Sequence, residues 1–509
     1  MTRRFGWAGL LVAAVLRPAA AQSSALTRAA GSITAADVHR RIFLIAADSM
    51  GGRNTPSPGL SKTASYIAAE FKRFGLKPGG DSGTYLLSYP IAMRRLLAAR
   101  SSVRFGNGTS GLATTLAEGA ALLSGPTSAE LGGSVVLVGG SVVPDSLKAE
   151  DIRDRVVVYV PAPNPQQGPG GGFRTLQRFG TLGAKAVVIV VDSSAFANYQ
   201  RMQLQPRLVV GDANRGTPLV VLQESAVLAQ LPEAGQQFAA LRAASATEVH
   251  PAGDWQGQVV LRDTVLTLEY APDVVGILEG SDPVLKHEYV VFSAHMDHVG
   301  TAGQPGSQCA AMGADSICNG ADDDGSGTVG VVELAAAFSR PGARPKRSLI
   351  FLTVSGEEEG LWGSAWFVSH PPVPLPQIVA DLNADMIGRN WKDTVVAIGK
   401  EHSDLGSTLN RVNAAHAELH MTAIDDRWPD ENFYSRSDHF NFARRGVPIL
   451  FFFNGTHPDY HQPSDSPDKI DAEKESRILK LLFYLGQEVA NAAQRPKWVA
   501  ESYRQIVEP

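Results

Sequence analysis

The second half of the chain alternates apolar segments of strand length with amphipathic segments of helix length. The apolar segments are VVGILEG, EYVVFSAH, SLIFLTVS, DLNADMI and VPILFFF, and helical patterns cover residues 326–339, 405–416 and 472–493. Strands that are apolar along their whole length and separated by helices form mainly parallel sheets with helices on both faces. We therefore expect an α/β domain with a mainly parallel, mixed sheet over residues 265–493. Ligands in such domains bind at the carboxyl ends of the strands.

The first half of the chain changes from helical patterns to strand-like patterns along its length. Residues 34–74 contain two helical patterns, and we take residues 33–123 as the N-terminal part of the same domain. Strand-like segments such as VVLVGG, RVVVYVPAP and AKAVVIVVD then dominate residues 124–257, which predicts an inserted β-rich domain. Residues 494–509 form a C-terminal tail. A chain of 509 residues is long enough for two or three domains.

The N-terminus has the pattern of a secretion signal. Arg3 and Arg4 precede an apolar segment at 5–16, and the small residues at 19–21 provide a cleavage site after Ala21. No later stretch reaches the roughly 20 apolar residues that a spanning helix needs. We therefore expect removal of residues 1–21 and a secreted or periplasmic protein without a membrane span; a retained N-terminal anchor is the alternative. The net charge of -5 argues against a nucleic-acid partner, and nothing in the sequence indicates an oligomeric state.

The only two cysteines, Cys309 and Cys318, lie in one loop-like segment with eight residues between them. In an oxidising compartment we expect them to form a disulfide, and two free thiols are the alternative. A zinc finger is excluded because no second pair of ligands lies nearby at finger spacing.

A histidine ends one of the predicted strands. His295 closes the segment EYVVFSAH, and imidazole is a good zinc ligand. Asp297 could accept the hydrogen bond from the other ring nitrogen of His295 and so fix its orientation. We interpret His298, the next residue, as a histidine at the rim of the site.

Carboxylates cluster at the other strand ends. Asp323 is the middle acid of NGADDDGSG, Glu357 and Glu358 lie in the turn SGEEEGLWG, Asp385 ends DLNAD, and His461 follows the last strand. Consecutive acids repel one another unless a cation neutralises them. An isolated run of acids is more often a solvated loop or a helix cap, and an EF-hand calcium loop does not fit the spacing. Adjacent side chains diverge, so one Glu can bind a metal while its neighbour acts as a base.

Together, these residues give two histidines and at least three carboxylates near the strand ends of one α/β unit. This is the ligand chemistry of a hydrolytic two-zinc site. The chain lacks the HExxH pattern of the common single-zinc proteases and the Gly-x-Ser-x-Gly elbow of α/β serine hydrolases.

Five motifs occur in the order found in metallopeptidase family 28, the dizinc aminopeptidases: SAHMDHVG, NGADDDGSG, SGEEEGLWGS, LNADMIG and YHQPSDSPDKID. The chain closely resembles this family over residues 271–493, and residues 33–96 also look like its N-terminal part. The resemblance implies a phosphorylase/hydrolase-like zinc peptidase fold, peptide substrates and two Zn²⁺ ions per chain. The insert resembles a protease-associated domain.

The resemblance also implies a role for each site residue. The metal ligands would be His295 and Asp385 for one zinc ion, Glu358 and His461 for the other, and Asp323 as the bridge between them. The remaining roles would be general base for Glu357, orientation of His295 for Asp297, and stabilisation of the oxyanion for Tyr460. The peptide after Asp323 would be cis, as in relatives. Cys318 departs from the family, which often has an aromatic residue there.

An exported aminopeptidase is the activity that we expect, and three alternatives stay open. A carboxypeptidase or dipeptidase would use the same metals but need a cationic pocket, for which Arg389, Arg427 and Arg436 are candidates. A glutaminyl cyclase of this fold normally keeps one zinc ion. A noncatalytic, receptor-like binding protein would have lost ligands or the base, and this chain has lost none.

Overall fold

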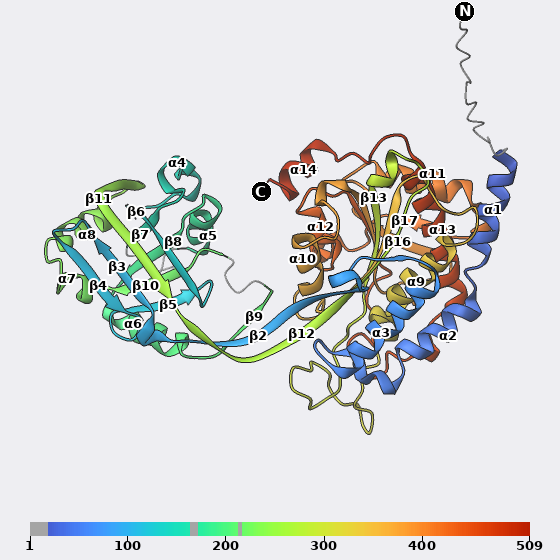
Figure 1. The fold of residues 1–509 in the computed structure, drawn as a ribbon, viewed down its shortest axis with the longest axis horizontal. Coiled ribbons are helices and arrows are strands. Elements are labelled where there is room, and N and C mark those ends of the chain that lie inside the picture. Colours follow the sequence, from blue (N-terminus) through green and yellow to red (C-terminus); the bar gives the residue numbers. More distant parts are fainter. Residues whose placement is uncertain (1–18, 163–171, 212–215, 509) are drawn as a thin grey trace, which may run out of the picture. The chain divides into compact units, whose positions relative to one another are not determined.

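The computed structural model describes residues 19–162, 172–211 and 216–508, and the chain forms two compact units (Figure 1). One unit consists of the described residues of Met1–Tyr89 and Tyr270–Pro509, and the other is Pro90–Glu269. The chain passes from one unit to the other within strands β2 (Leu86–Leu96) and β12 (Asp263–Leu278).

The first unit is built on a mixed sheet with the strand order β17-β16-β18-β15-β13-β14-β12. The four strands β18, β15, β13 and β14 are parallel. β12 runs antiparallel to β14 and β16 runs antiparallel to β18, whereas β17 is parallel to β16. Nearly every residue of the four parallel strands is buried, as expected for a sheet covered on both faces. The predicted fold class is therefore confirmed. The strands are β13 (Tyr289–His295), β14 (Ser348–Val354), β15 (Ile378–Ala384), β16 (Thr394–Ile398), β17 (Thr422–Ile424) and β18 (Ile449–Phe452).

Helices cover both faces of this sheet. α9 packs on β13, β14 and β15, and α2, α3 and α13 contact α9. α10 and α12 lie on the other side of the sheet (Figure 1), where Phe367 and Phe442 join the apolar core. The helices predicted at 326–339, 405–416 and 472–493 are confirmed as α9, α11 and α13. The bounds are α2 (Ala35–Ile45), α3 (Pro58–Arg73), α9 (Gly327–Phe338), α10 (Trp362–Ser369), α11 (Leu405–Ala415), α12 (His439–Ala443), α13 (Ala472–Asn491) and α14 (Ala500–Ile506).

Capping side chains set the starts of α2 and α3. The hydroxyl of Thr34 accepts a hydrogen bond from the Asp37 N–H, and the hydroxyl of Ser57 accepts one from the Leu60 N–H. Between the two helices lies a turn whose Arg53 is fully buried. This turn reaches the site described below.

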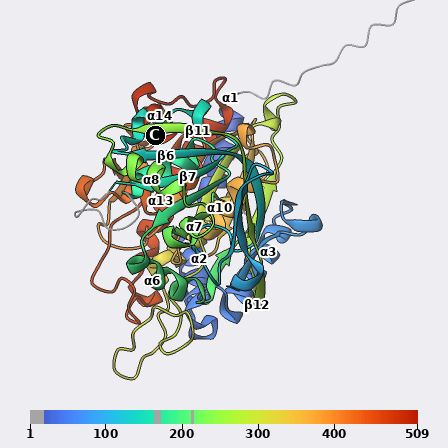
Figure 2. The ribbon, with the colours of Figure 1, turned by 90° about the vertical axis from the view of Figure 1, so that its left-hand side faces the viewer.

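The second unit is an eight-stranded sheet with the order β4-β3-β11-β6-β7-β8-β10-β5. Its strands β6, β7, β8 and β10 are parallel, and α8 contacts β6 and β7 (Figure 2). Alternate residues of β6 enter two apolar cores, Val135 and Leu137 one, Val136 and Val138 the other. The bounds are β3 (Ser102–Gly106), β4 (Gly111–Thr115), β5 (Ala120–Ser124), β6 (Ala129–Gly140), β7 (Val156–Pro161), β8 (Ala186–Val191), β10 (Leu219–Gln223), β11 (Glu248–Leu261), α5 (Phe173–Thr181), α6 (Ser193–Gln203), α7 (Glu224–Leu228) and α8 (Ala234–Ala243).

The bounds of this unit differ from the insert that the sequence predicts at 124–257. The structure also places residues 90–123 and 258–269 in the second unit. The reason is that β3 pairs with β11, with Val103 opposite Val259, so that both side chains enter the same apolar core. The likeness of the unit to a protease-associated domain stays a prediction.

The signal peptide predicted at 1–21 lies almost wholly outside the described residues, which begin with α1 (Ala19–Gly31). α1 contacts α9 and α13, and its residues Ala29 and Ala30 are buried. Among the described residues, no helix has the length and apolar character needed to cross a membrane. Export of the chain stays a prediction.

Candidate metal centre

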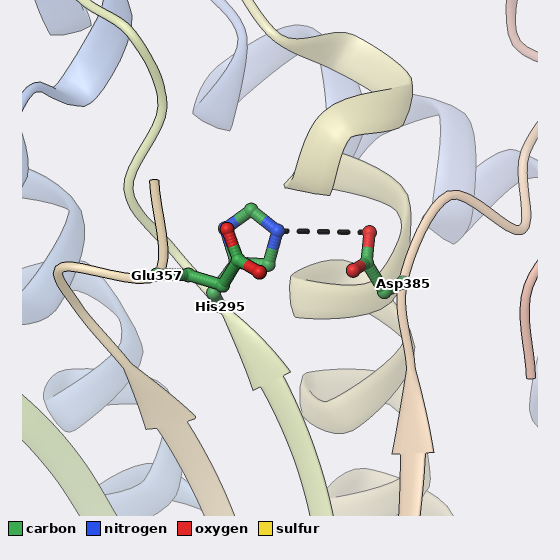
Figure 3. A group of neighbouring side chains, drawn as sticks. All are labelled: His295, Glu357 and Asp385. Atoms are coloured by element: carbon green, nitrogen blue, oxygen red, sulfur yellow. Dashed lines mark ion pairs between the residues drawn. The ribbon is translucent and has the colours of Figure 1, made fainter. Parts of the chain in front are cut away.

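The predicted ligands meet at the carboxyl edge of the parallel sheet. His295 is the last residue of β13, Glu357 follows β14 in a turn, and Asp385 follows β15 directly. Figure 3 shows these three side chains converging from neighbouring strand ends, and their ligand atoms lie within 4.8 Å of one another. The convergence follows from the topology, because the ends of adjacent parallel strands share one edge of a sheet.

His295 is held so that one ring nitrogen faces the acids of the site. Its Nε2 lies 3.4 Å from Oδ1 of Asp323 and 3.6 Å from Oδ1 of Asp385. Its Nδ1 lies 3.5 Å from Oδ1 of Asp297, whose other oxygen accepts a hydrogen bond from Thr55. This arrangement leaves Nε2 free for a metal and places Asp297 where it can orient the ring.

Asp323 lies between two histidines. Its Oδ1 faces His295, while its Oδ2 lies 3.2 Å from Nε2 of His461. The peptide after Asp323 is cis, as the resemblance implies. One carboxylate with an oxygen directed to each side has the geometry of a bridging ligand.

Glu358 forms the other side of the site. Its Oε2 lies 3.0 Å from Nε2 of His461, and its Oε1 lies 2.9 Å from Nδ1 of His298. Glu358, Asp323 and His298 form a second group of potential ligands, distinct from the group of Figure 3. The interpretation of His298 as a rim histidine is wrong, because its side chain is completely buried.

The two neighbours of Asp323 have structural partners instead. Oδ1 of Asp322 accepts hydrogen bonds from the Gly388 N–H and the Ser326 hydroxyl. The carboxylate of Asp324 accepts hydrogen bonds from the backbone N–H groups of His295 and Gly327. Of the three consecutive acids, Asp323 is therefore the one available to a metal.

The contacts among these side chains fit a metal better than they fit direct hydrogen bonds. Nε2 of His461, Oδ2 of Asp323 and Oδ1 of Asp385 are buried and hydrogen-bond to no described residue, although potential partners lie 3.0 to 3.6 Å away. Ligand atoms at about 2.0–2.2 Å from a tetrahedral zinc ion are roughly 3.3–3.6 Å from one another. Imidazole and carboxylate are also ligands that zinc prefers.

The charge balance of the site leads to the same conclusion. Burial alone lowers the pKa of His461, but its contacts with Asp323 and Glu358 outweigh this and raise that pKa to about 10. The pKa of His295 is likewise raised, against burial, by Glu357 and Asp385. The acids thus require positive charge between them, which protons supply in the apo protein and which metal ions would replace.

Glu357 borders a narrow cavity of about 40 Å³ beside the potential ligands. Burial, reinforced by the neighbouring charge of Glu358, raises the pKa of Glu357 well above the usual range, although His295 opposes this. Tyr460 lines the same cavity, and burial raises the pKa of its hydroxyl, which stays a hydrogen-bond donor. The remaining walls are Met386, Phe433, Phe451, Phe453, Thr456, Arg436 and Ser437.

The predicted disulfide between Cys309 and Cys318 is present, and its loop lies against the site. Sγ of Cys318 is 3.6 Å from the carbonyl oxygen of His461. The side-chain amide of Gln308 donates to the carbonyl oxygen of Glu358 at 3.1 Å. The loop therefore contacts the backbone of two potential ligands.

Sequence reasoning missed two buried side chains that contact the ligands, His298 and Ser437. The Ser437 hydroxyl donates to Oδ2 of Asp385 at 2.9 Å, and nothing in the local sequence marks it. The sequence gives one indication that His298 belongs to the site, because it lies one residue after Asp297. Of the three arginines considered for a cationic pocket, Arg436 borders the cavity, whereas Arg389 pairs with Asp459 at 2.7 Å.

Known proteins share this site region. Residues 273–486 match the family model described as Peptidase family M28. A probable leucine aminopeptidase of Arthroderma benhamiae is 29% identical over 245 residues, which are 44% of this chain and 65% of that protein. Leupeptin-inactivating enzyme 1 of Streptomyces exfoliatus is 32% identical over 158 residues, 30% of this chain and 34% of the relative. The chain thus aligns with less than two thirds of these relatives' lengths.

A solved structure, a zinc aminopeptidase from Bacillus subtilis, matches with a TM-score of 0.45 at 17% identity. The match covers 91% of this chain and 96% of that one.

Proposed function

We propose that this chain is an exported zinc-dependent aminopeptidase of peptidase family M28, whose model matches residues 273–486. The observation that carries this proposal is the position of Glu357 beside His295 and Asp385, at the end of a sheet where Asp323 connects them to Glu358 and His461. Metal-assisted hydrolysis requires a general base next to a cation site made of imidazole and carboxylate groups.

We assign two zinc ions to the site. His295 and Asp385 would hold one, Glu358 and His461 the other, and Asp323 would bridge them. When bound, the metal pair lowers the pKa of a water molecule and polarises the carbonyl of the scissile peptide. Asp297 fixes the His295 ring from the opposite nitrogen, and Ser437 fixes the Asp385 carboxylate.

Glu357 moves the proton. Its carboxylate takes a proton from the attacking water and delivers it to the nitrogen of the leaving amine. The raised pKa of Glu357 favours the first transfer, because a carboxylate with the ordinary pKa is a weaker base toward the attacking water.

Tyr460 faces the developing negative charge. Its hydroxyl borders the cavity next to Glu357 and keeps its proton because burial raises its pKa. It can therefore donate a hydrogen bond to the carbonyl oxygen as that oxygen becomes an oxyanion. The Tyr460 ring stacks on the His461 ring at a centroid distance of 3.8 Å, which limits its movement.

The similarity to a probable leucine aminopeptidase favours the amino end of a peptide. Glu357, Asp323 and Asp385 border the cavity that would receive that end. Its apolar walls suit an apolar first side chain. Arg436 is the arginine in the described lining, and it supports the competing proposal of a carboxypeptidase. Its side chain is half exposed and stacks on Phe433.

The proposal is tested with one peptide in three forms, with both ends free, with the N-terminus acetylated, and with the C-terminus amidated. An aminopeptidase removes the first residue from the free and amidated forms and leaves the acetylated form intact. Cleavage of the acetylated form at its C-terminus, with the amidated form intact, would establish a carboxypeptidase instead. Mass spectrometry of the products distinguishes these outcomes.

A further inference from the structure

His298 contacts a potential metal ligand but has no role in the scheme above. It is completely buried, and its Nδ1 lies 2.9 Å from Oε1 of Glu358. The other oxygen of Glu358 lies 3.0 Å from Nε2 of His461. The Glu358 carboxylate is therefore held between two imidazoles, and the sequence accounts for only one of them.

The environment of the His298 ring decides whether its Nδ1 donates a hydrogen bond to Glu358 or binds a metal ion. Nε2 of His298 is buried and hydrogen-bonds to no residue in the described part of the chain. A metal ligand would present a lone pair at Nδ1, which would put the proton on Nε2, where it has no acceptor. A proton on Nδ1 instead donates to Glu358 and leaves an acceptor lone pair on Nε2. The donor tautomer avoids burying an unsatisfied N–H group, which would be destabilising.

The ring is also held in place by backbone that packs on it. Gly320 has a φ of +57°, and a Cβ at this position would lie 2.4 Å from Cγ of His298. The guanidinium of Arg53 donates to the Gly320 carbonyl at 2.8 Å and so holds this turn against the ring. The backbone N–H of His298 donates to the Arg53 carbonyl at 3.3 Å. His298 thus has a fixed orientation that does not depend on its contact with Glu358.

We propose that His298 is a positioning residue that orients the Glu358 carboxylate through Nδ1–H and so raises the affinity of the Glu358–His461 side of the centre for its metal ion. The inference rests on the proposed two-ion site. Outer hydrogen-bond partners of metal ligands are typically worth 10- to 100-fold in metal affinity. We expect an effect of that size on one of the two zinc affinities and little effect on the other.

The test measures zinc binding rather than peptidase activity. Apo protein is titrated with zinc against a chromophoric chelator, for the wild type, His298→Ala and His298→Asn. The Ala variant should bind one ion with the wild-type affinity and the second about 10- to 100-fold more weakly. The Asn amide nitrogen can take the place of Nδ1, so His298→Asn should recover most of the loss. His416→Ala, at a partly exposed histidine that contacts Glu418, is the matched control.

Three results would overturn the proposal. The first is that His298→Ala binds both zinc ions with the wild-type affinities. The second is that His298→Ala loses affinity for both ions equally and that its apo form has a lower melting temperature. The third is that the cobalt-loaded His298→Asn variant has a changed d–d absorption spectrum. The last result would make His298 a ligand. Because zinc binding is the readout, a wild type that binds two ions but cleaves no peptide would refute the proposed function and leave this inference intact.

Discussion

Glu357 and Glu358 are consecutive in the chain, yet their carboxylates belong to different groups of potential ligands. Glu357 lies with His295 and Asp385, and Glu358 lies with Asp323 and His298. The divergence arises because both residues lie in the turn that follows β14, where neighbouring side chains leave the backbone in different directions. It allows one carboxylate to hold a metal ion while its neighbour transfers protons.

Glu357→Gln should separate these two roles. The amide keeps the size of the side chain but cannot accept the proton of water, so we expect kcat to fall by roughly 10²- to 10⁴-fold. Zinc content, measured by mass spectrometry of the metal, should stay at the wild-type value. Glu359→Gln, one position further from the strand, is the control and should keep its activity. A fully active Glu357→Gln enzyme would refute the assignment of the base.

Asp323 and His461 should differ in how many metal ions their loss removes. Asp323 directs one oxygen to His295 and the other to His461, whereas Nε2 of His461 faces the carboxylates of Glu358 and Asp323. Asp323→Ala should therefore weaken both ions, and His461→Ala should weaken one. Stepwise zinc titration of the two variants measures this difference. Loss of the same number of ions from both would contradict the bridging assignment.

The loop closed by the disulfide should stabilise the metal centre. The contacts of Gln308 with the Glu358 carbonyl and of Cys318 with the His461 carbonyl depend on the path of this loop. In the double variant Cys309→Ser/Cys318→Ser we expect a loss of about 2 kcal/mol of stability. We also expect faster loss of zinc to a chelator, followed by stopped-flow absorbance. Unchanged rates of zinc loss would show that the loop has no part in holding the ligands.

Asp381 in β15 should make stability depend on pH. Its carboxyl group is fully buried beside Ser293, and burial raises its pKa to about 8. The unfolded chain has an aspartate pKa of about 4, so between these values the folded state holds a proton that the unfolded state releases. The contribution of Asp381 is therefore fully present below about pH 4 and is lost as the pH rises to about 8.

Asp381→Asn removes this titration. Its melting temperature should fall less than that of the wild type between pH 5 and pH 8.5. The exposed Asp145→Asn serves as the control. Parallel declines in the wild type and in Asp381→Asn would show that Asp381 does not hold its proton in the folded state.

The sequence predicts the first unit well because local pattern determines it. Each strand of the parallel sheet is an apolar run bounded by a polar turn. His295, Glu358 and Asp385 end or closely follow such runs, so the edge where they meet follows from topology. The second unit was less predictable at its start. Strand β3 pairs with β11, and the paired residues lie 150 to 158 positions apart in the chain, so no local pattern in residues 102–106 indicates that partner.

His298 illustrates the same limit within the site. Its burial depends on Gly320 and on Arg53, which come from two distant segments and pack on it from outside the HMDH motif. Spacing identifies His295 and Asp297, because their roles are local to one strand end. It cannot show which face of a following residue the rest of the chain will cover.

The most direct test of the central claim is the rate of aminoacyl-substrate hydrolysis as zinc is returned to the chelator-treated full chain. We expect no activity in the apo protein and a rise with added zinc that levels off at two equivalents, with the N-acetylated substrate uncleaved throughout. Hydrolysis that survives complete removal of metal, or that is equally fast on the acetylated substrate, would contradict a zinc-dependent aminopeptidase centred on Glu357.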